Sequence, residues 1–355
     1  MKKNRLLLID GNSIINRAFF ALPPMDNGQG LHTNAIYGFL TMLFKMIKNY
    51  EPSHISVAFD MKAPTFRHKS YTEYKAGRKK MPGELAMQLQ PLKDVLDKMN
   101  IDRQEIEGYE ADDILGTLSL DAEKEGYEVY IVTGDRDAIQ LASEKTRVLI
   151  TKKGVGEVEE YDAKAVMERY LLTPDQFIDL KGLMGDKSDN IPGIPGIGEK
   201  TGIKLLLEYK TVQGVLDNVD KLKGAQKKKV EENMESALMS KDLATIFREV
   251  PLDYSLDQMA FGDFSMEDLV KTFQDLKFNS LIARLNDLVG QEDQELDIDI
   301  CQLTDFDGFI DQAKDKGHLY MKIFRAEENI LDKAIYMTYL SLESDKIYRV
   351  HGDDI

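Results

Sequence analysis

Three carboxylates fall within the four residues from Glu110 to Asp113, directly before an apolar run that has the spacing of a helix. Glu110 and Asp113 are three residues apart, so on a helix they share a face. Acidic residues in a first helical turn also complement the helix macrodipole, and this ordinary interpretation would be sufficient for the stretch alone. Whether these carboxylates instead belong to a functional site depends on the other carboxylates of the chain.

Short apolar runs elsewhere in the chain each end near an aspartate. These runs, at residues 5–10, 54–60 and 127–134, lead to Asp10, Asp60, Asp135 and Asp137. Helical patterns at 35–50, 85–99 and 114–126 alternate with them, which predicts an α/β fold with a mostly parallel sheet and helices on both faces. Ligands bind beyond the carboxyl ends of the strands in such sheets, so we expect these aspartates to face one site.

A second acidic pair lies in the helical half of the sequence. Asp186 and Asp189 are three residues apart, and a Gly/Pro-rich turn follows them before a predicted helix at 200–209. Small residues allow backbone amides and a helix N-terminus to approach a phosphate closely. A purely structural turn would explain the glycines equally well.

Residues 61–80 carry seven Lys or Arg residues and one Glu, with Phe66, Tyr71 and Tyr74 interleaved. Charge runs of this kind are usually solvated surface. Here the run directly follows a strand-end aspartate and mixes cations with aromatics, as in elements that track the backbone and stack the bases of single-stranded nucleic acid.

The net charge of −16 at first argues against a nucleic-acid partner. Eight of the acids lie between residues 290 and 311, where there is no Lys or Arg, and the remainder outside the predicted site is close to neutral. The single cysteine, Cys301, excludes an internal disulfide and favours a reducing compartment. The sequence contains no apolar run long enough for a signal or a membrane span, so we expect a soluble cytoplasmic protein.

The strand-end and loop acids form a set with a distinctive composition. Nine carboxylates in one cleft would repel one another unless they were protonated or held cations. No His or Cys joins them at ligand spacing, so zinc is unfavoured and the oxygen set suits two Mg²⁺ or Mn²⁺ ions. Two such ions would support in-line phosphodiester displacement. The predicted ligands are Asp10, Asp60, Glu110, Asp112, Asp113, Asp135, Asp137, Asp186 and Asp189.

The ordered motifs resemble the 5′-nuclease (flap endonuclease-like) family, and within it the N-terminal 5′→3′ exonuclease domain of the bacterial DNA polymerase I family. The resemblance covers about residues 5–290. It is carried by Leu8–Asn12, Ala58–Asp60, Phe66-Arg67, Glu73–Lys75 with Arg78, Gly108–Asp113, Thr133–Asp137, Gly185–Gly193 and Gly196–Thr201. It implies a PIN-like 5′-nuclease fold, followed by a helical DNA-binding subdomain with a helix–turn–helix (helix-hairpin-helix-like) element.

The resemblance also implies roles for individual residues. All nine carboxylates would hold the two metal ions: Asp10, Asp60, Glu110 and Asp112 nearer one, and Asp113, Asp135, Asp137, Asp186 and Asp189 nearer the other. Lys75, Arg78, Asp112 and Asp113 are the predicted catalytic residues. The predicted DNA contacts are Arg67, Tyr74, Lys75, Arg78, Gly196, Gly198, Lys200 and Thr201, with Arg17 as a further candidate and a K⁺ ion near 185–201.

The predicted organisation is a catalytic domain at 1–172 with an arch at 61–82, a helical subdomain at 173–289, an acidic linker at 290–300 and the incomplete start of a 3′→5′ exonuclease-like domain at 301–355. The strand at 319–324 lacks the Asp-x-Glu of active proofreading domains, so this last unit is expected to be vestigial. No polymerase domain is present in the chain. In the full-length protein a polymerase would lie in cis.

The implied activity is removal of 5′ flaps and RNA primers from nicked or flapped DNA by a nucleoid-associated monomer. Two alternatives stay open. A PIN-like metal-dependent ribonuclease would use a similar acidic cleft on unstructured RNA. A catalytically silent DNA-binding module would bind flaps without turnover and without regard to Mg²⁺.

Overall fold

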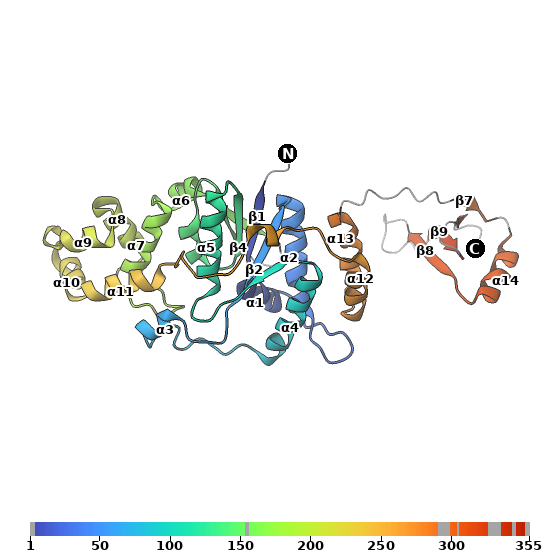
Figure 1. The fold of residues 1–355 in the computed structure, drawn as a ribbon, viewed down its shortest axis with the longest axis horizontal. Helices are drawn as coiled ribbons and strands as arrows, with labels where there is room; N and C mark the ends of the chain where they lie inside the picture. Colours follow the sequence, from blue (N-terminus) through green and yellow to red (C-terminus); the bar gives the residue numbers. More distant parts are fainter. Residues whose placement is uncertain are drawn as a thin grey trace. The chain divides into compact units, whose positions relative to one another are not determined.

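The computed structural model describes residues 4–152, 156–289, 299–303, 305–325, 335–342 and 346–351. Its contacts divide the chain into two units, Met1–Val289 and Gly290–Ile355, which are described separately (Figure 1). No helix in the described ranges is long and apolar enough to cross a membrane.

The first unit is built on a six-stranded sheet in the order β3-β2-β1-β4-β5-β6. The first five of its strands run parallel and β6 is antiparallel to β5. Apolar β1 therefore lies between β2 and β4, which brings the three strands that lead to aspartates side by side. The strands are β1 (Arg5–Asp10), β2 (His54–Ala58), β3 (Asp102–Gln104), β4 (Glu128–Thr133), β5 (Thr146–Thr151) and β6 (Val158–Tyr161).

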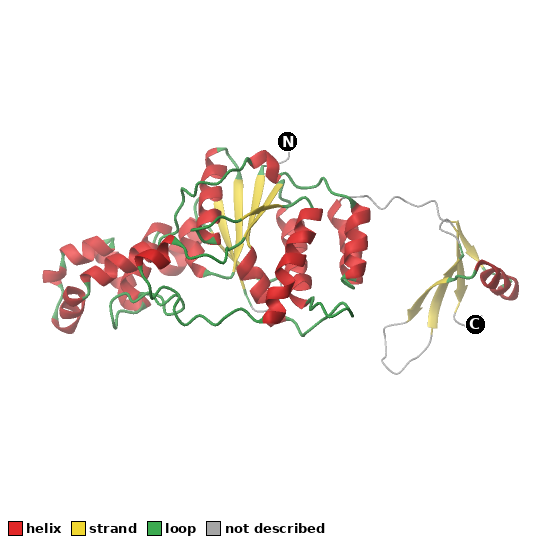
Figure 2. Cartoon of the chain, turned by 60° about the horizontal axis from the view of Figure 1, so that its bottom comes forward, coloured by secondary structure: helices red, strands yellow, loops and turns green. Residues whose placement is uncertain are grey.

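Alternate residues of β1 enter two different cores, because successive side chains of a strand point to opposite faces. Leu6 and Leu8 pack with α5 (Ala111–Lys124) and the helices that follow it, whereas Leu7 and Ile9 pack with α1 (Gly11–Ala21), α2 (Asn34–Tyr50) and α4 (Gly83–Lys98). Figure 2 shows helices on both faces of the sheet. The predicted α/β layering is confirmed.

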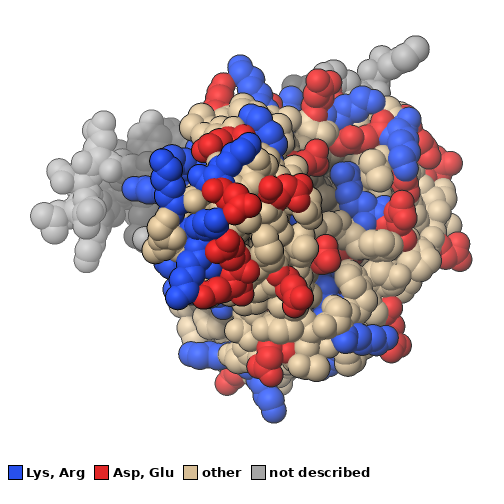
Figure 3. Space-filling view, turned by 90° about the vertical axis from the view of Figure 1, so that its left-hand side faces the viewer, with Lys and Arg blue, Asp and Glu red and all other residues tan. Residues whose placement is uncertain are grey.

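A helical lobe extends the first unit at the left of Figure 1. It follows α6 (Ala163–Tyr170) and consists of α7 (Pro174–Met184), α8 (Glu199–Tyr209), α9 (Val212–Asp217), α10 (Gly224–Glu232) and α11 (Met234–Ala244). Figure 3 views this lobe end-on and shows Lys and Arg interspersed with Asp and Glu, so the face turned to the viewer carries both charges.

The predicted helical subdomain at 173–289 is divided in the structure. Helices α12 (Met266–Asp275) and α13 (Asn279–Val289) pack on α4 and α2 rather than with the lobe. Phe273 lies 6.2 Å from Phe44 between ring centroids. The amphipathic pattern of these helices predicted their existence, but their burial against the sheet layer depends on the return of the chain through residues 245–265.

Short elements complete the unit. Helix α3 (Phe66–Ser70) lies in the predicted arch between β2 and α4, and three 3₁₀ helices are present at η1 (Arg136–Leu141), η2 (Val219–Lys221) and η3 (Leu256–Met259). The sequence patterns had not predicted α1, α3 or the edge strands β3 and β6.

The second unit has a four-stranded sheet in the order β7-β10-β9-β8, with β7 (Asp299–Gln302), β8 (Tyr320–Arg325), β9 (Ile335–Ser341) and β10 (Lys346–His351). Helix α14 (Phe306–Lys316) supplies Phe309 to a small core with Leu340, Leu342 and Val350. The predicted linker at 290–300 lies outside the described residues up to 298, and residues 299 and 300 already belong to β7.

Candidate active site

An open cleft of about 740 Å³ lies where β1, β2 and β4 end. Five predicted ligands line it: Asp10, Asp60, Glu110, Asp112 and Asp135. Four cations share the same lining: Arg17, Lys75, Arg78 and Lys79. The structure therefore brings together acids that are 125 residues apart at the extremes of the numbering, as the parallel topology predicts.

The strand-end aspartates are fixed by backbone and hydroxyl donors. Asp10 caps α1 by accepting a hydrogen bond from the Ser13 amide at 2.9 Å, and its second oxygen accepts one from the Thr133 hydroxyl at 2.8 Å. Asp60 accepts a hydrogen bond from the Ala111 amide at 2.8 Å. These bonds tie the end of β1 to the end of β4 and to the start of α1, and they tie the residue after β2 to the first turn of α5.

Helix α5 begins between Glu110 and Asp112. Both residues line the cleft, and Asp112 has a buried oxygen, Oδ1, with no hydrogen-bond partner in the described structure. A buried carboxylate oxygen without a donor is costly unless it is protonated or binds a cation. Asp112 is thus the residue whose surroundings most clearly call for an additional positive group.

The electrostatics of the cleft agree with this interpretation. Burial, together with the charge of Asp60, raises the pKa of Asp10 to about 7. Burial also raises the pKa of Asp60, and burial followed by repulsion from Asp10 raises the pKa of Asp112 well above its ordinary value. Like charges in a desolvated cleft oppose ionisation, and divalent cations would reverse that opposition.

The donor chemistry suits a hard cation, since every acidic group in the cleft offers oxygen. In the described part of the chain, however, no three acidic, histidine or cysteine side chains converge closely enough to form a finished metal centre. Lysine and arginine side chains instead neutralise several of the acids. The fit to metal ions therefore rests on the orphaned oxygen of Asp112 and the crowding of Asp10, Asp60 and Asp112.

The two predicted catalytic cations lie in the cleft and are held by acids. The Lys75 ammonium is 2.6 Å from Glu110 Oε1, and Arg78 pairs with Asp189. The Lys75 amide also donates to the Asp189 carbonyl at 2.8 Å, and Lys75 itself has a left-handed backbone with φ of 56°. The arch is thereby fastened to the loop that carries Asp189.

A buried lysine that the sequence analysis did not single out organises the second acidic group. Lys181, on α7, pairs with both Asp137 and Asp186, and its ammonium lies 2.5 Å from Asp186 Oδ2. Its position five residues before Asp186 was the available signal, but only the fold shows that Asp137 faces it as well. The Lys181 ammonium therefore lies between two predicted metal ligands and neutralises part of their charge.

The loop that carries Asp186 and Asp189 depends on two glycines. Gly185 and Gly193 have φ values of 70° and 59°, and a Cβ atom at Gly193 would overlap the backbone of Gly185. The close approach allows Asp186 and Ile191 to exchange backbone hydrogen bonds at 2.7 and 2.8 Å. The glycines of this motif are therefore required by backbone geometry, independently of any phosphate.

Asp113 is not part of the cleft lining, unlike its neighbours Glu110 and Asp112. Its side chain is fully buried, and its two oxygens accept four hydrogen bonds: two from Arg67 at 2.7 and 2.8 Å, one from the Phe247 amide at 2.8 Å and one from the Glu110 amide at 3.0 Å. A carboxylate has about four acceptor positions, so none remains for a metal ion or a substrate. A role of Asp113 as metal ligand or catalytic residue would require Arg67 or one of the amides to release it, and that role stays a prediction.

Two predicted DNA contacts are also buried. Arg67 is 3% exposed and donates to Asp113 and to the carbonyls of Leu243 and Thr245. Tyr74 is 4% exposed, and its hydroxyl lies 3.1 Å from Glu110 Oε2. Both side chains fasten the arch to the rest of the unit, and with so little exposed surface their role as DNA contacts stays a prediction.

The remaining predicted DNA contacts lie at the surface of the helical lobe. Gly198 caps α8, and Gly196, Gly198 and Lys200 are exposed, with Thr201 half-buried in the first turn. The N-terminus of α8 is thus accessible to a phosphate, as the sequence suggests. Its role stays a prediction.

The chain matches two consecutive family models. Residues 5–171 match the 5′-3′ exonuclease, N-terminal resolvase-like domain, and residues 172–267 match the 5′-3′ exonuclease, C-terminal SAM fold. Residues 5–267 belong to the 5′-3′ exonuclease family. The acidic cleft is therefore that of a nuclease family member, and the models meet close to the start of α7.

Curated relatives of this exonuclease region are similar along most of the chain. DNA polymerase I of Bacillus subtilis is 48% identical over 308 residues, which cover 86% of this chain and 35% of the relative. DNA polymerase I of Streptococcus pneumoniae (strain R6) is 48% identical over 294 residues, with 81% and 33% covered. The chain thus spans about a third of the length of these relatives.

Solved structures share the fold at low identity. The T5 D15 protein co-crystallised with metal ions has a TM-score of 0.55 at 21% identity, covering 81% of this chain and 98% of its own. The catalytic core of Rad2 in complex with DNA substrate (complex III) has a TM-score of 0.55 at 14% identity, with 81% and 93% covered. These likenesses confirm the fold of the exonuclease region.

Proposed function

We propose that this exonuclease-family chain hydrolyses phosphodiesters near the 5′ ends of DNA, including 5′ flaps and RNA primers, with two divalent metal ions. The observation that carries the proposal is the cleft in which Asp10, Asp60 and Asp112 have raised pKa values while Lys75 and Arg78 flank them. Such a cleft repels a phosphate without cations and accepts it with them.

The acids of the cleft would bind metal ions, and its cations would contact the phosphate. Asp10, Asp60, Glu110, Asp112 and Asp135 would hold divalent ions, with Mg²⁺ or Mn²⁺ suiting their oxygen donors. When bound, such ions supply a metal-activated water and charge stabilisation for the leaving oxygen. Lys75 and Arg78 would leave their carboxylate partners for the scissile phosphate and neutralise its developing charge.

The second acidic group would contribute after rearrangement. Asp137, Asp186 and Asp189 are engaged by Lys181 and Arg78, so their binding of a second ion requires these cations to move. The exposed start of α8, with Gly196, Gly198, Lys200 and Thr201, would hold duplex backbone, and a K⁺ ion near 185–201 would support that contact.

The relatives support a cellular setting for this activity. The relatives described above are DNA polymerases I, and we propose that the chain acts as a monomeric unit on nicked, flapped or RNA-primed DNA, with a polymerase in cis in the full-length protein. The cytoplasmic nucleoid is the matching location. The second unit would be a vestigial 3′→5′ exonuclease-like segment.

A flap-cleavage assay with product-end analysis tests this function. A 5′-flap duplex should yield a 5′-phosphate product with Mg²⁺ or Mn²⁺ and none with EDTA, and Asp112→Ala should abolish the product. Glu168→Gln, an exposed acid on α6, is the matched control and should cleave normally. Undiminished cleavage by Asp112→Ala would reject the proposed site.

The same assay distinguishes the alternatives. Preference for unstructured RNA over flap DNA would favour a PIN-like ribonuclease. Flap binding without turnover, and with an affinity indifferent to Mg²⁺, would favour a silent binding module. The exonuclease-family membership of residues 5–267 favours the first proposal over both.

A further inference from the structure

One face of α1 lines the acidic cleft along the whole helix. Ser13, Asn16, Arg17 and Phe20 recur at spacings of three and four residues, and all four belong to the cleft lining. Asp10 precedes the helix, and with a rise of about 1.5 Å per residue the backbone of Phe20 lies roughly 15 Å farther along its axis. The face leads from the acids to the outer end of the cleft.

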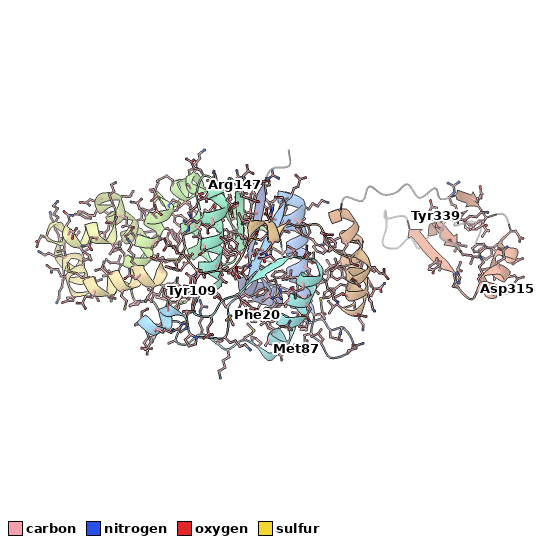
Figure 4. The ribbon with its side chains drawn as sticks, in the orientation of Figure 1. Phe20, Met87, Tyr109, Arg147, Asp315 and Tyr339 are labelled. Carbon is pink, nitrogen blue, oxygen red and sulfur yellow. The ribbon has the colours of Figure 1, made fainter. Side chains whose placement is uncertain are left out.

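Phe20 is anomalous on this face. Its side chain is 70% exposed, the highest value among the large apolar residues of the described chain. Figure 4 labels Phe20 between Tyr109 and Met87, in the lower part of the first unit. Since so exposed a ring adds little to the stability of the fold, its apolar surface is available to a ligand.

The Phe20 ring is also held in place. Its neighbour Phe19 packs partly buried against the core beneath α1 and α2, and the two rings meet edge to face with centroids 5.1 Å apart and planes at 84°. A ring that is oriented before binding loses less conformational entropy when a ligand stacks on it. Met81, which is 37% exposed, adds apolar surface to the same cleft.

Arg17, one turn before Phe20, supplies a complementary charge. It lines the cleft, and its Nε is buried without a hydrogen-bond partner among the described residues. Because Arg17 also lines the open cleft, its guanidinium is suited to binding a phosphate oxygen there. A cation and an exposed aromatic ring three residues apart on one helix face match the phosphate and the base of one nucleotide.

We propose that Phe20 and Arg17 form a nucleotide subsite at the outer end of the cleft, where Phe20 stacks on an unpaired base and Arg17 binds its backbone phosphate. The proposal rests on the proposed nuclease function and deepens it. A base inside a duplex has both faces covered by its neighbours, so the subsite selects a strand that is single-stranded there. The selectivity for flaps would then come partly from α1.

Fluorescence of 2-aminopurine tests the contact directly. The probe is placed in turn at the first three unpaired positions of a 5′ flap, in Ca²⁺ buffer under conditions where no product forms. Wild-type chain should quench the probe at one position, Phe20→Ala should lose the quench, and Phe20→Tyr should keep it. Met87→Ala, an exposed apolar residue on α4 labelled in Figure 4, is the control and should quench as wild type.

Cleavage of a flap with an abasic nucleotide at the quenched position provides the second measurement. Stacking on an aromatic side chain contributes enough that the abasic flap should lower wild-type kcat/KM by about tenfold. Phe20→Ala should lose about tenfold on the normal flap and no further activity on the abasic flap. Independent, multiplicative losses would overturn the proposal.

Different results would reject the nuclease function and the nucleotide subsite. A chain that quenches the probe but never cleaves a flap would reject the nuclease function and retain the subsite. A chain that cleaves flaps with equal rates in wild type and Phe20→Ala, and shows no quench at any of the three positions, would reject the subsite and retain the nuclease function.

Discussion

Asp10 and Asp60 at the sheet edge and Asp186 in the α7–α8 loop are the same residue type, but their pKa values are shifted in opposite directions. Burial raises the pKa of Asp10 and Asp60, and both line the open cleft. Burial also opposes ionisation of Asp186, but hydrogen bonds from Lys181 and Ser188 lower its pKa overall. The difference teaches that a shared acidic pattern does not give a shared state. Lys181 and Ser188 lower the pKa of the half-buried Asp186, whereas burial and the charge of Asp135 raise the pKa of Asp137 to about 7 although Lys181 contacts it as well.

Unequal sensitivity to substitution is the largest expected consequence of this comparison. Asp112→Asn should lower flap cleavage on the order of 10³-fold, because the substitution removes the negative charge of a cleft carboxylate that has no hydrogen-bond partner at Oδ1. Asp186→Asn should cost only about tenfold, since Lys181 already satisfies that carboxylate. Single-turnover kinetics at saturating Mg²⁺ measure both, and equal losses would remove the distinction between the two groups.

Loss of the buried Arg67 should be the largest effect on stability. Arg67→Met leaves the fully buried Asp113 without its partner, which should lower the free energy of unfolding by about 3–5 kcal/mol. Urea denaturation measures it. Arg103→Met, which breaks a more exposed pair with Asp97, is the control and should cost less than about 1 kcal/mol.

A companion variant separates structure from metal binding. Asp113→Asn should lower stability but leave the Mg²⁺ affinity of the folded chain unchanged, because Asp113 has no acceptor position free. Isothermal titration with Mg²⁺ checks it. A weakened Mg²⁺ affinity in the folded variant would restore Asp113 to the ligand set.

Substitution of Lys181 tests whether the acids that it neutralises, Asp137 and Asp186, can bind a metal ion instead. Lys181→Met leaves Asp137 and Asp186 without their shared cation, so metal-free stability should fall by about 1–3 kcal/mol. Saturating Mg²⁺ should restore part of the loss, since a divalent ion can replace the ammonium. Lys164→Met, an exposed lysine on α6, should change neither value. Absence of any rescue would show that these acids do not accept a metal ion.

The smallest expected effect is a pH dependence. Because burial raises the pKa of Asp10 from 3.8 to about 7, the folded state binds this proton more tightly than the unfolded state. The resulting stabilisation is fully present below about pH 4 and is lost as the pH rises to about 7, at up to about 1.4 kcal/mol per pH unit. Asp10→Asn should remove this part of the slope in metal-free thermal melts. An unchanged slope would contradict the raised pKa.

The strand-end aspartates of the candidate site could be predicted from the local sequence pattern, but the hydrogen bonding of Asp113 could not. Apolar runs that end in Asp10, Asp60 and Asp135 predicted both the strands and their common edge, since parallel strands deliver their carboxyl ends together. The pattern of strand ends did not predict the surroundings of Asp113. Its spacing from Glu110 suits a shared face, but the structure uses it to cap the helix start and to pair with Arg67.

In the arch, too, the sequence predicted the residue types but not which side chains are exposed. Its mixture of cations and aromatics predicted a solvent-facing DNA contact, and Lys75 and Arg78 do reach the cleft. Tyr74 instead packs with Ile191, Leu243 and Ala244. Composition identifies which side chains are able to bind nucleic acid, but burial by segments more than 100 residues away decides which remain exposed to do so.

The sequence by itself determined the alternating strands and helices, the carboxylate set and the family, because these depend on local periodicity and on ordered motifs. The tertiary structure alone decided which acids are paired, because Lys181, Arg67 and Arg78 reach their partners only after the sheet and the helical lobe have assembled. It also decided that Phe20 faces the cleft. Electrostatic state depends on distance and desolvation, and both are properties of the folded chain.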